Sequence, residues 1–148
     1  VRESKDLATF WDILDKNLTN KYATHPVHSL EELTLLHSRF PNSIRLFMAY
    51  NDKGIAIGGT IIYDMPQVVH TQYISASPEG KRLGAIDLLF NYILNDVYAN
   101  RKGFFDFGKS TEEEGKILNT TLIFQKEGFG GRGVCYDCYT WETRSVIE

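Results

Sequence analysis

Hydrophobic spacing divides the chain into a helical beginning and a mixed remainder. Apolar residues at helical intervals predict a first helix over residues 5–18. A second helix begins at Ser29, where Ser29 and Glu32 form a capping box, and runs to about Phe40. Because apolar positions then alternate or follow one another without a break, three strands are predicted over residues 44–50, 55–63 and 68–75. Their connections are too short for crossovers, so these strands should form an antiparallel meander.

The second half of the chain alternates between helix and strand. A helix that begins at Pro78 carries an apolar stripe to about Ala99. The strand Phe104–Phe107 should then lie parallel to a meander strand, because a right-handed crossover joins them. The remaining pattern predicts a helix over residues 112–126 and a last strand over 134–142. The expected fold class is therefore α/β, with a mixed sheet that carries helices on both faces, in a single domain over residues 1–148.

Composition narrows the class of protein. The chain has 148 residues, 43% of them hydrophobic, which is enough for a globular domain with its own core. A formal net charge of -3 argues against general nucleic-acid binding, which needs clustered Lys and Arg. We expect a cytoplasmic protein without a membrane span, because the sequence has no long apolar run and no signal-peptide pattern. The chain begins at Val1 rather than Met, which favours a piece of a longer protein.

The Cys and His residues do not indicate a metal site. Cys135 and Cys138 fall in the last predicted strand, where residues three apart point to opposite faces. We therefore expect inert thiols rather than a disulfide or a ligand pair. No second Cys pair completes a zinc site, and no acid stands at ligand spacing from His25, His28 or His37.

The stretch from residue 103 to 133 is the most informative part of the chain, because a strand breaks at a glycine into a polar loop and a helix. Two patterns stand out, Phe105-Asp106-Phe107-Gly108-x-Ser110 and Lys126-Glu127-Gly128-Phe129-Gly130-Gly131. Together with the order of the elements, they resemble the GNAT acyltransferase superfamily, although the usual first strand is missing. Within that superfamily the sequence is most similar to the C-terminal half of the Fem-type transferases. Those proteins join two GNAT-like halves and pass an amino acid from a charged tRNA to a peptidoglycan precursor.

The resemblance implies a partner half and a carrier-bound donor, but two departures bear on the donor. Ordinary members carry Arg or Gln, then Gly three residues on and Gly or Ala five residues on, where the long helix begins. If Gly84 is the middle glycine, Lys81 and Ile86 stand in the outer positions. Ordinary members also often have a Tyr general acid in the last helix, where this chain has Phe124. The donor is therefore expected to be an acyl-CoA, acetyl-CoA included, or an aminoacyl-tRNA, and an N-terminal GNAT-like half would lie upstream.

The donor-binding candidates lie between the third meander strand and the long helix. They are Ser75, Ala76, Gly80, Lys81, Arg82 and Gly84. Backbone N–H groups at a helix N-terminus favour anions and can polarise a carbonyl group, while the two cations can neutralise phosphates. The structural alternative is a first helical turn that faces solvent.

Three residues are the catalytic candidates. Lys126 matches the Fem-type lysine that stabilises the transferring acyl group, and it could equally complement the helix dipole. Asp106 could orient an amine or accept its proton, or it could bond to the following loop. His70 could act as a general base near neutral pH or be structural.

The substrate-binding candidates are Tyr73, Lys109 and Ser110. Tyr73 is expected on the face of its strand opposite His70, and the other two line the loop after the Asp-Phe-Gly pattern. Two functions remain open. One is an N-acyltransferase that acts on an amine acceptor, such as a cell-envelope precursor or a sugar. The other is a non-catalytic GNAT-like domain that binds a ligand or supports a partner domain. The two motifs favour the transferase.

Overall fold

A computed structural model describes residues 1–142 of the chain. These residues form two compact units, Val1–Lys109 and a second unit that begins at Ser110. No helix among the described residues is long and apolar enough to cross a membrane.

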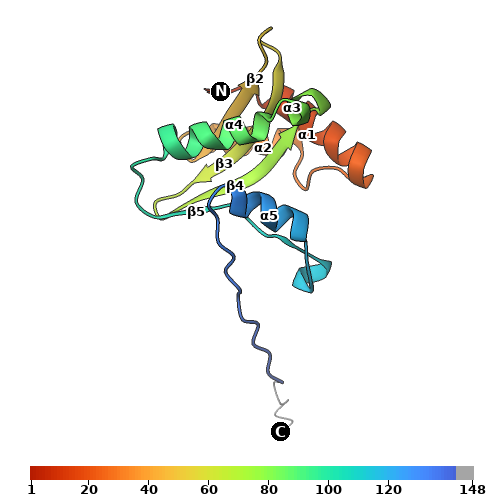
Figure 1. Ribbon diagram of the computed structural model, residues 1–148, viewed down its shortest axis with the longest axis vertical. Coiled ribbons are helices and arrows are strands. Elements are labelled where there is room, and N and C mark those ends of the chain that lie inside the picture. The colour runs from red at the N-terminus through yellow and green to blue at the C-terminus, as the bar shows by residue number, and fades with distance from the viewer. Residues whose placement is uncertain (143–148) are drawn as a thin grey trace. The chain divides into compact units, whose positions relative to one another are not determined.

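The first unit is built on a five-stranded sheet (Figure 1). Its strands, in spatial order, are β1 (Arg2–Ser4), β2 (Ile44–Tyr50), β3 (Ala56–Asp64), β4 (Val68–Ala76) and β5 (Phe104–Asp106). Neighbouring strands are antiparallel except β4 and β5, which are parallel. The predicted meander, the parallel strand and the mixed α/β class are confirmed.

The strand β1 corrects the expectation that the first strand is missing. Its residues are polar, so they show no hydrophobic alternation. It forms because it hydrogen-bonds to the open edge of β2, with Glu3 opposite Phe47. The guanidinium of Arg45 also donates to the carboxylate of Glu3 at 2.9 and 2.8 Å. A partner strand and an ion pair, rather than apolar periodicity, hold β1 in place.

Helices cover both faces of the sheet, as predicted. The helices α1 (Leu7–Tyr22) and α2 (Leu30–Arg39) cover one face, and α4 (Ala85–Tyr92) with a π-helical turn (Ile93–Val97) covers the other (Figure 1). The core under α1 and α2 includes Phe10, Leu14, Leu33, Leu46, Met48 and Ile61. The core under α4 includes Phe47, Ile62, Val69, Leu89 and Ile93. The sheet is therefore buried on both sides.

The single helix expected from Pro78 to Ala99 is divided. A short helix, α3 (Pro78–Arg82), ends at Leu83, and α4 begins after Gly84. Gly84 has a φ of 68°, a left-handed conformation that glycine adopts without steric cost. The apolar stripe continues across this break, so the hydrophobic pattern does not reveal it.

The second unit begins with a two-stranded ribbon of β6 (Thr111–Glu112) and β7 (Ile117–Leu118), followed by α5 (Thr120–Gly128). The predicted helix over 112–126 is therefore wrong in its first half. Asn119 is the N-cap of α5, and its side chain accepts a hydrogen bond from the backbone N–H of Leu122 at 2.9 Å. Asparagine is a favoured N-cap because its oxygen satisfies one of the first amides of a helix.

The last predicted strand, over residues 134–142, is not formed. Residues 130–142 have no regular secondary structure. Tyr136 and Trp141 in this stretch are 93% and 81% exposed. A strand needs a partner for its backbone groups, and none pairs with these residues in the described chain. Cys135 and Cys138 are exposed free thiols.

Candidate functional site

His70 and Asp106 form a pair where the parallel ladder between β4 and β5 ends. The ladder runs from Val68 opposite Phe104 to His70 opposite Asp106, whereas β4 continues to Ala76. Nδ1 of His70 lies 2.7 Å from Oδ2 of Asp106. The structure therefore joins two of the three catalytic candidates, which stand 36 positions apart in the sequence.

Asp106 is held from two sides. Its Oδ1 accepts a hydrogen bond of 2.7 Å from the backbone N–H of Gly108, and its main-chain carbonyl accepts one of 3.1 Å from Oγ1 of Thr71. Gly108 has a φ of 72°, which turns the chain back toward the carboxylate. The alternative that Asp106 bonds to the following loop is thus confirmed for one of its oxygens, while the other oxygen faces His70.

This geometry suits His70 for proton transfer. When Nδ1–H donates to the Asp106 carboxylate, Nε2 keeps the lone pair that accepts a proton. The side chain of His70 is 26% exposed, so the imidazole is neither fully buried nor free in solvent. The pair therefore has the arrangement of a general base held by a carboxylate.

A β-bulge at Gln72 changes which residues share a face of β4. Tyr73 lies opposite Ile61 and Thr71 opposite Ile62, which leaves Gln72 without a partner on β3. His70 lies opposite Tyr63, two residues from Ile61, so His70 and Tyr73 point to the same side of the sheet. The expectation that Tyr73 faces away from His70 is therefore wrong, because the inserted residue reverses the alternation. Bulges are common beside active sites, where they redirect side chains.

Tyr73 connects this face to the loop between α1 and α2. Its hydroxyl is hydrogen-bonded to Nδ1 of His28 at 2.6 Å. The indole of Trp11 packs edge-on against its ring, with centroids 5.4 Å apart. Position 73, a predicted substrate-binding residue, thus joins β4, α1 and the loop.

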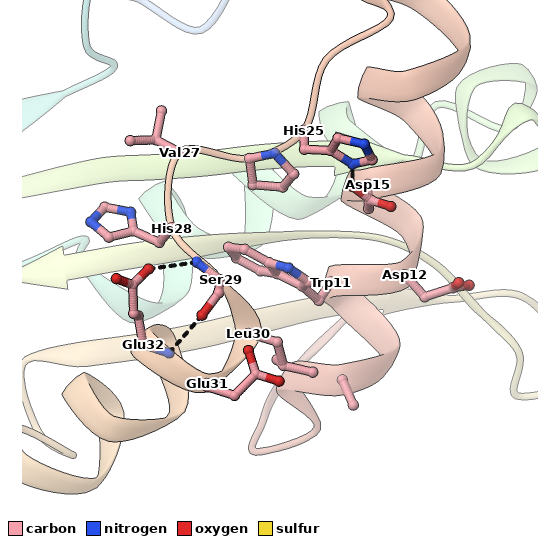
Figure 2. A pocket seen from close by; sticks show the side chains of 12 residues that line it. Trp11, Asp12, Asp15, His25, Val27, His28, Ser29, Leu30, Glu31 and Glu32 are labelled. Atoms are coloured by element: carbon pink, nitrogen blue, oxygen red, sulfur yellow. Dashed lines mark hydrogen bonds and ion pairs between the residues drawn. The ribbon is translucent and has the colours of Figure 1, made fainter.

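The same loop and α1 line an open pocket of about 660 Å³ (Figure 2). Trp11 lies between the helix and the loop in this view, with Asp15 and Glu31 on opposite sides of the indole. His25 of the loop is paired with Asp15 at 2.6 Å. The capping box of Ser29 and Glu32 closes one wall and is confirmed. Hydrogen bonds to the backbone and to Ser29 lower the pKa of Glu31.

The donor-binding candidates lie together, from the end of β4 to the start of α4. The side chains of Ser75 and Ala76 are buried, and Oγ of Ser75 donates to the carbonyl of Ile13 at 3.5 Å. Gly80 packs against β3 so closely that an added Cβ would lie 1.9 Å from the carbonyl oxygen of Ile57. Close packing therefore already accounts for a glycine at position 80.

The two cations of this group are exposed, whereas Gly84 is partly buried. Nζ of Lys81 donates to the side-chain oxygen of Asn17, and Arg82 is exposed. The helix α4 has Gly84 as its N-cap, without a side-chain hydrogen bond to its first amides. These amides could bind an anion together with Lys81 and Arg82, which precede them in the sequence.

The remaining candidates are divided between the two units. Lys109 is the exposed last residue of the first unit. In the second unit, the carbonyl of Ser110 accepts a hydrogen bond of 2.9 Å from the backbone N–H of Asn119. Lys126 is partly buried in α5, and its carbonyl accepts bonds from Phe129 and Gly131 that close the helix end. Groups of three or more potential metal ligands are absent from the described residues.

A charge network on the opposite face of the sheet is structural. Asp64, 12% exposed, is paired with Arg45 at 3.4 Å and with Arg101 at 2.9 Å. The hydroxyl of Tyr98 donates to Asp64 at 2.9 Å. Burial, together with this hydrogen bond, raises the pKa of Tyr98 to about 12. The Arg45 guanidinium lowers the pKa of Glu3, which fastens β1 to the sheet.

Comparison with solved structures identifies the fold as that of N-acetyltransferases. A possible acetyltransferase from Clostridium difficile 630 is 16% identical, with a TM-score of 0.69 over 97% of this chain and 96% of that one. An aminoglycoside antibiotic 6'-N-acetyltransferase from Acinetobacter baumannii is 14% identical, with a TM-score of 0.60 over 97% of each chain. A spermidine N-acetyltransferase chimera from Vibrio cholerae and human sequences is 20% identical, with a TM-score of 0.60 over 86% and 76%.

The sequence supports the same assignment. The pattern of the acetyltransferase (GNAT) domain family matches residues 1–114, so the chain belongs to that family. The match includes His70 and Asp106 and ends before Lys126. A search of curated proteins finds no significant match.

Three features of the site were not predicted from the sequence. They are the bond between His28 and Tyr73, the bulge at Gln72 and the pocket beside Trp11. A bulge has no signal in a single sequence.

Proposed function

We propose that this protein transfers an acetyl group from acetyl-CoA to an amine, with His70 as the general base and Asp106 as the group that orients it. The observation that carries the proposal is the hydrogen bond between them at the end of the β4–β5 ladder. Membership in the acetyltransferase (GNAT) family supports this reaction. An aminoglycoside N-acetyltransferase of the same fold, 18% identical with a TM-score of 0.58, has been solved in complex with CoA.

The reaction assigns one role to each group. Nε2 of His70 takes a proton from the ammonium form of the acceptor, and the Asp106 carboxylate stabilises the imidazolium that results. The neutral nitrogen forms a bond to the thioester carbonyl carbon, and the bond from that carbon to sulfur breaks. The sulfur leaves as the thiolate of CoA, which takes up the proton that the acylated nitrogen loses as it becomes an amide.

The ladder between β4 and β5 ends before β4 does. Beyond His70, β4 has no partner strand on its β5 side within Val1–Lys109. Backbone N–H groups of that edge, near the bulge at Gln72, can donate to a developing oxyanion. The first amides of α4 at Gly84, with Lys81 and Arg82, are then the candidates for the diphosphate of CoA.

Fem-type aminoacyl transfer is the alternative within the same fold. The sequence pattern at Lys126 favours it, and Lys109 and Ser110 would then contact the acceptor. In that case the donor would be an aminoacyl-tRNA, and an upstream GNAT-like half would complete the protein. A non-catalytic GNAT-like domain is the second alternative, favoured by Phe124 where ordinary members often have a Tyr.

The test measures acetyl transfer and donor binding with the same preparation. CoA produced from acetyl-CoA is quantified by chromatography with a panel of amines, because a thiol-reactive dye would also label Cys135 and Cys138. His70→Gln should lower kcat by about a hundredfold, the usual contribution of a general base. Asp106→Asn should lower kcat by at least about tenfold, because it no longer fixes the tautomer of His70.

The matched control is His37→Gln, which removes a histidine of α2 outside the site. Its kcat should equal that of the unchanged protein. If His70→Gln retains full kcat, His70 is not the base. Calorimetry with acetyl-CoA and with a minimal aminoacyl-tRNA mimic separates the two donors, and binding of neither would contradict the transferase proposal.

A further inference from the structure

Tyr63 of β3 lies beside the proposed base. In the ladder between β3 and β4 it is the direct partner of His70. Residues that face each other across two antiparallel strands point to the same side of the sheet. The rings of Tyr63 and His70 are accordingly 6.4 Å apart, measured between their centroids, at an angle of 49°. A group that binds to the imidazole on this face therefore also lies near the phenol ring.

The hydroxyl of Tyr63 differs from the other polar groups on this face of the sheet. His70 is bonded to Asp106, and the hydroxyl of Tyr73 is bonded to His28. The hydroxyl of Tyr63 forms no hydrogen bond within the described chain. Every buried side-chain nitrogen or oxygen atom of those residues has a partner, so this hydroxyl must be accessible. It is therefore available to a molecule that binds beside His70.

The ring of Tyr63 is held by packing and its hydroxyl is neutral. Tyr63 is partly buried and packs against the core under α1 and α2. Burial, and to a smaller extent the neighbouring Tyr73, raises the pKa of Tyr63 above its usual value of 10.0. The phenol therefore keeps its proton near neutral pH, and its oxygen can accept a hydrogen bond. A polar group held in this way can orient a ligand.

An acceptor amine has N–H groups for both side chains. The ammonium form of a primary amine has three N–H groups, and His70 takes the proton of one of them. A second N–H can donate to the phenol oxygen of Tyr63. Two hydrogen bonds of about 3 Å each span about 6 Å, which is comparable with the distance between the two rings. One nitrogen can therefore contact both side chains.

We propose that Tyr63 orients the acceptor amine for His70 by accepting a hydrogen bond from the reacting nitrogen. This inference rests on the proposed acetyl transfer and adds to it a residue that binds the acceptor. The bond limits the rotation of the amine while Nε2 of His70 removes a proton, so fewer orientations compete with the attack on the thioester.

The variant Tyr63→Phe removes the hydroxyl and keeps the ring. It is assayed with acetyl-CoA and a series of primary amines that begins with ethylamine. Because the contact is with the reacting nitrogen, kcat/KM should fall by at least about tenfold for every amine that the unchanged protein acetylates, the usual effect of losing one hydrogen bond to a charged group. The KM for acetyl-CoA should stay the same, since the donor does not contact this hydroxyl.

The matched control is Tyr92→Phe. Tyr92 is also partly buried, but it packs against the core under α4, on the opposite face of the sheet. Its hydroxyl likewise has no hydrogen bond to residues that the structure describes. Both variants should keep the urea midpoint of the unchanged protein, because neither loses a bond, and Tyr92→Phe should also keep its kcat/KM.

Four results would overturn the inference. They are an unchanged kcat/KM in Tyr63→Phe, an equal loss in Tyr92→Phe, a loss for some amines only, and an equal rise in KM for acetyl-CoA. The second and fourth would indicate a general disturbance, and the third a contact with the rest of the acceptor rather than its nitrogen.

The variant His70→Gln separates this inference from the proposed function. If His70→Gln loses activity and Tyr63→Phe does not, the proposed function stands and Tyr63 has no part in it. If Tyr63→Phe loses activity and His70→Gln does not, Tyr63 keeps its role and His70 is not the base. Absence of acetyl transfer by the unchanged protein would contradict both.

Discussion

Replacing Gly80 with alanine separates a packing role from a donor-binding role at this position. The added Cβ would lie 1.9 Å from the carbonyl oxygen of Ile57, whereas a carbon and an oxygen in contact are about 3.3 Å apart. The carbonyl cannot turn away easily, because it accepts hydrogen bonds from the backbone N–H of Ser77 at 2.9 Å and from its Oγ at 3.2 Å. The helix α3 must therefore move away from β3 by more than about 1 Å.

The expected loss can be worked from two opposing effects. Overpacking of a close contact costs about 3 kcal/mol when backbone has to shift. Alanine regains about 1 kcal/mol over glycine through helix propensity. The free energy of unfolding should therefore fall by about 2 kcal/mol, and the melting temperature by about 4–8 °C for a chain of this size.

Urea unfolding followed by circular dichroism measures this loss. The control is Gly128→Ala at the end of α5, where an added Cβ meets nothing within 4 Å. That variant should be as stable as the unchanged protein or gain up to about 1 kcal/mol. If Gly80→Ala behaves like the control, α3 does not pack on β3 as described. If it keeps full stability and only weakens acetyl-CoA binding, Gly80 serves the donor instead.

Two further predictions concern Tyr98 and Lys126. The folded state raises the pKa of Tyr98 from 10.0 to about 12, so its contribution to stability is present below pH 10 and is lost as the pH rises toward 12. Urea titrations between these pH values should show this loss, and Tyr98→Phe should show a smaller one; equal slopes would contradict the burial of the phenol. Lys126→Ala should lower the turnover of the transferase with little change in urea midpoint, if the cation assists the acyl group. Unchanged turnover would remove Lys126 from the site.

Elements whose periodicity reflects burial were predictable from the sequence. The three meander strands and the first two helices are found where apolar spacing and the capping box of Ser29 placed them. The predictions that were wrong concern elements that depend on strand pairing or on backbone conformation rather than on burial. The polar strand β1 depends on the edge of β2, and the break at Gly84 leaves the apolar stripe intact. The stretch after Gly133 alternates like a strand but has no partner in the described chain.

The candidate site, like the fold, was predictable from the sequence only in part. The sequence by itself indicated that Asp106 is an unusual acid in an otherwise apolar strand, because charged carboxylates are rarely buried. It also placed His70 in a strand as a candidate base. Only the tertiary structure decided that they form a pair, because the parallel register of β4 and β5 is set by long-range packing. It also decided that Tyr73 shares their face, since one inserted residue reverses the direction of every side chain that follows it.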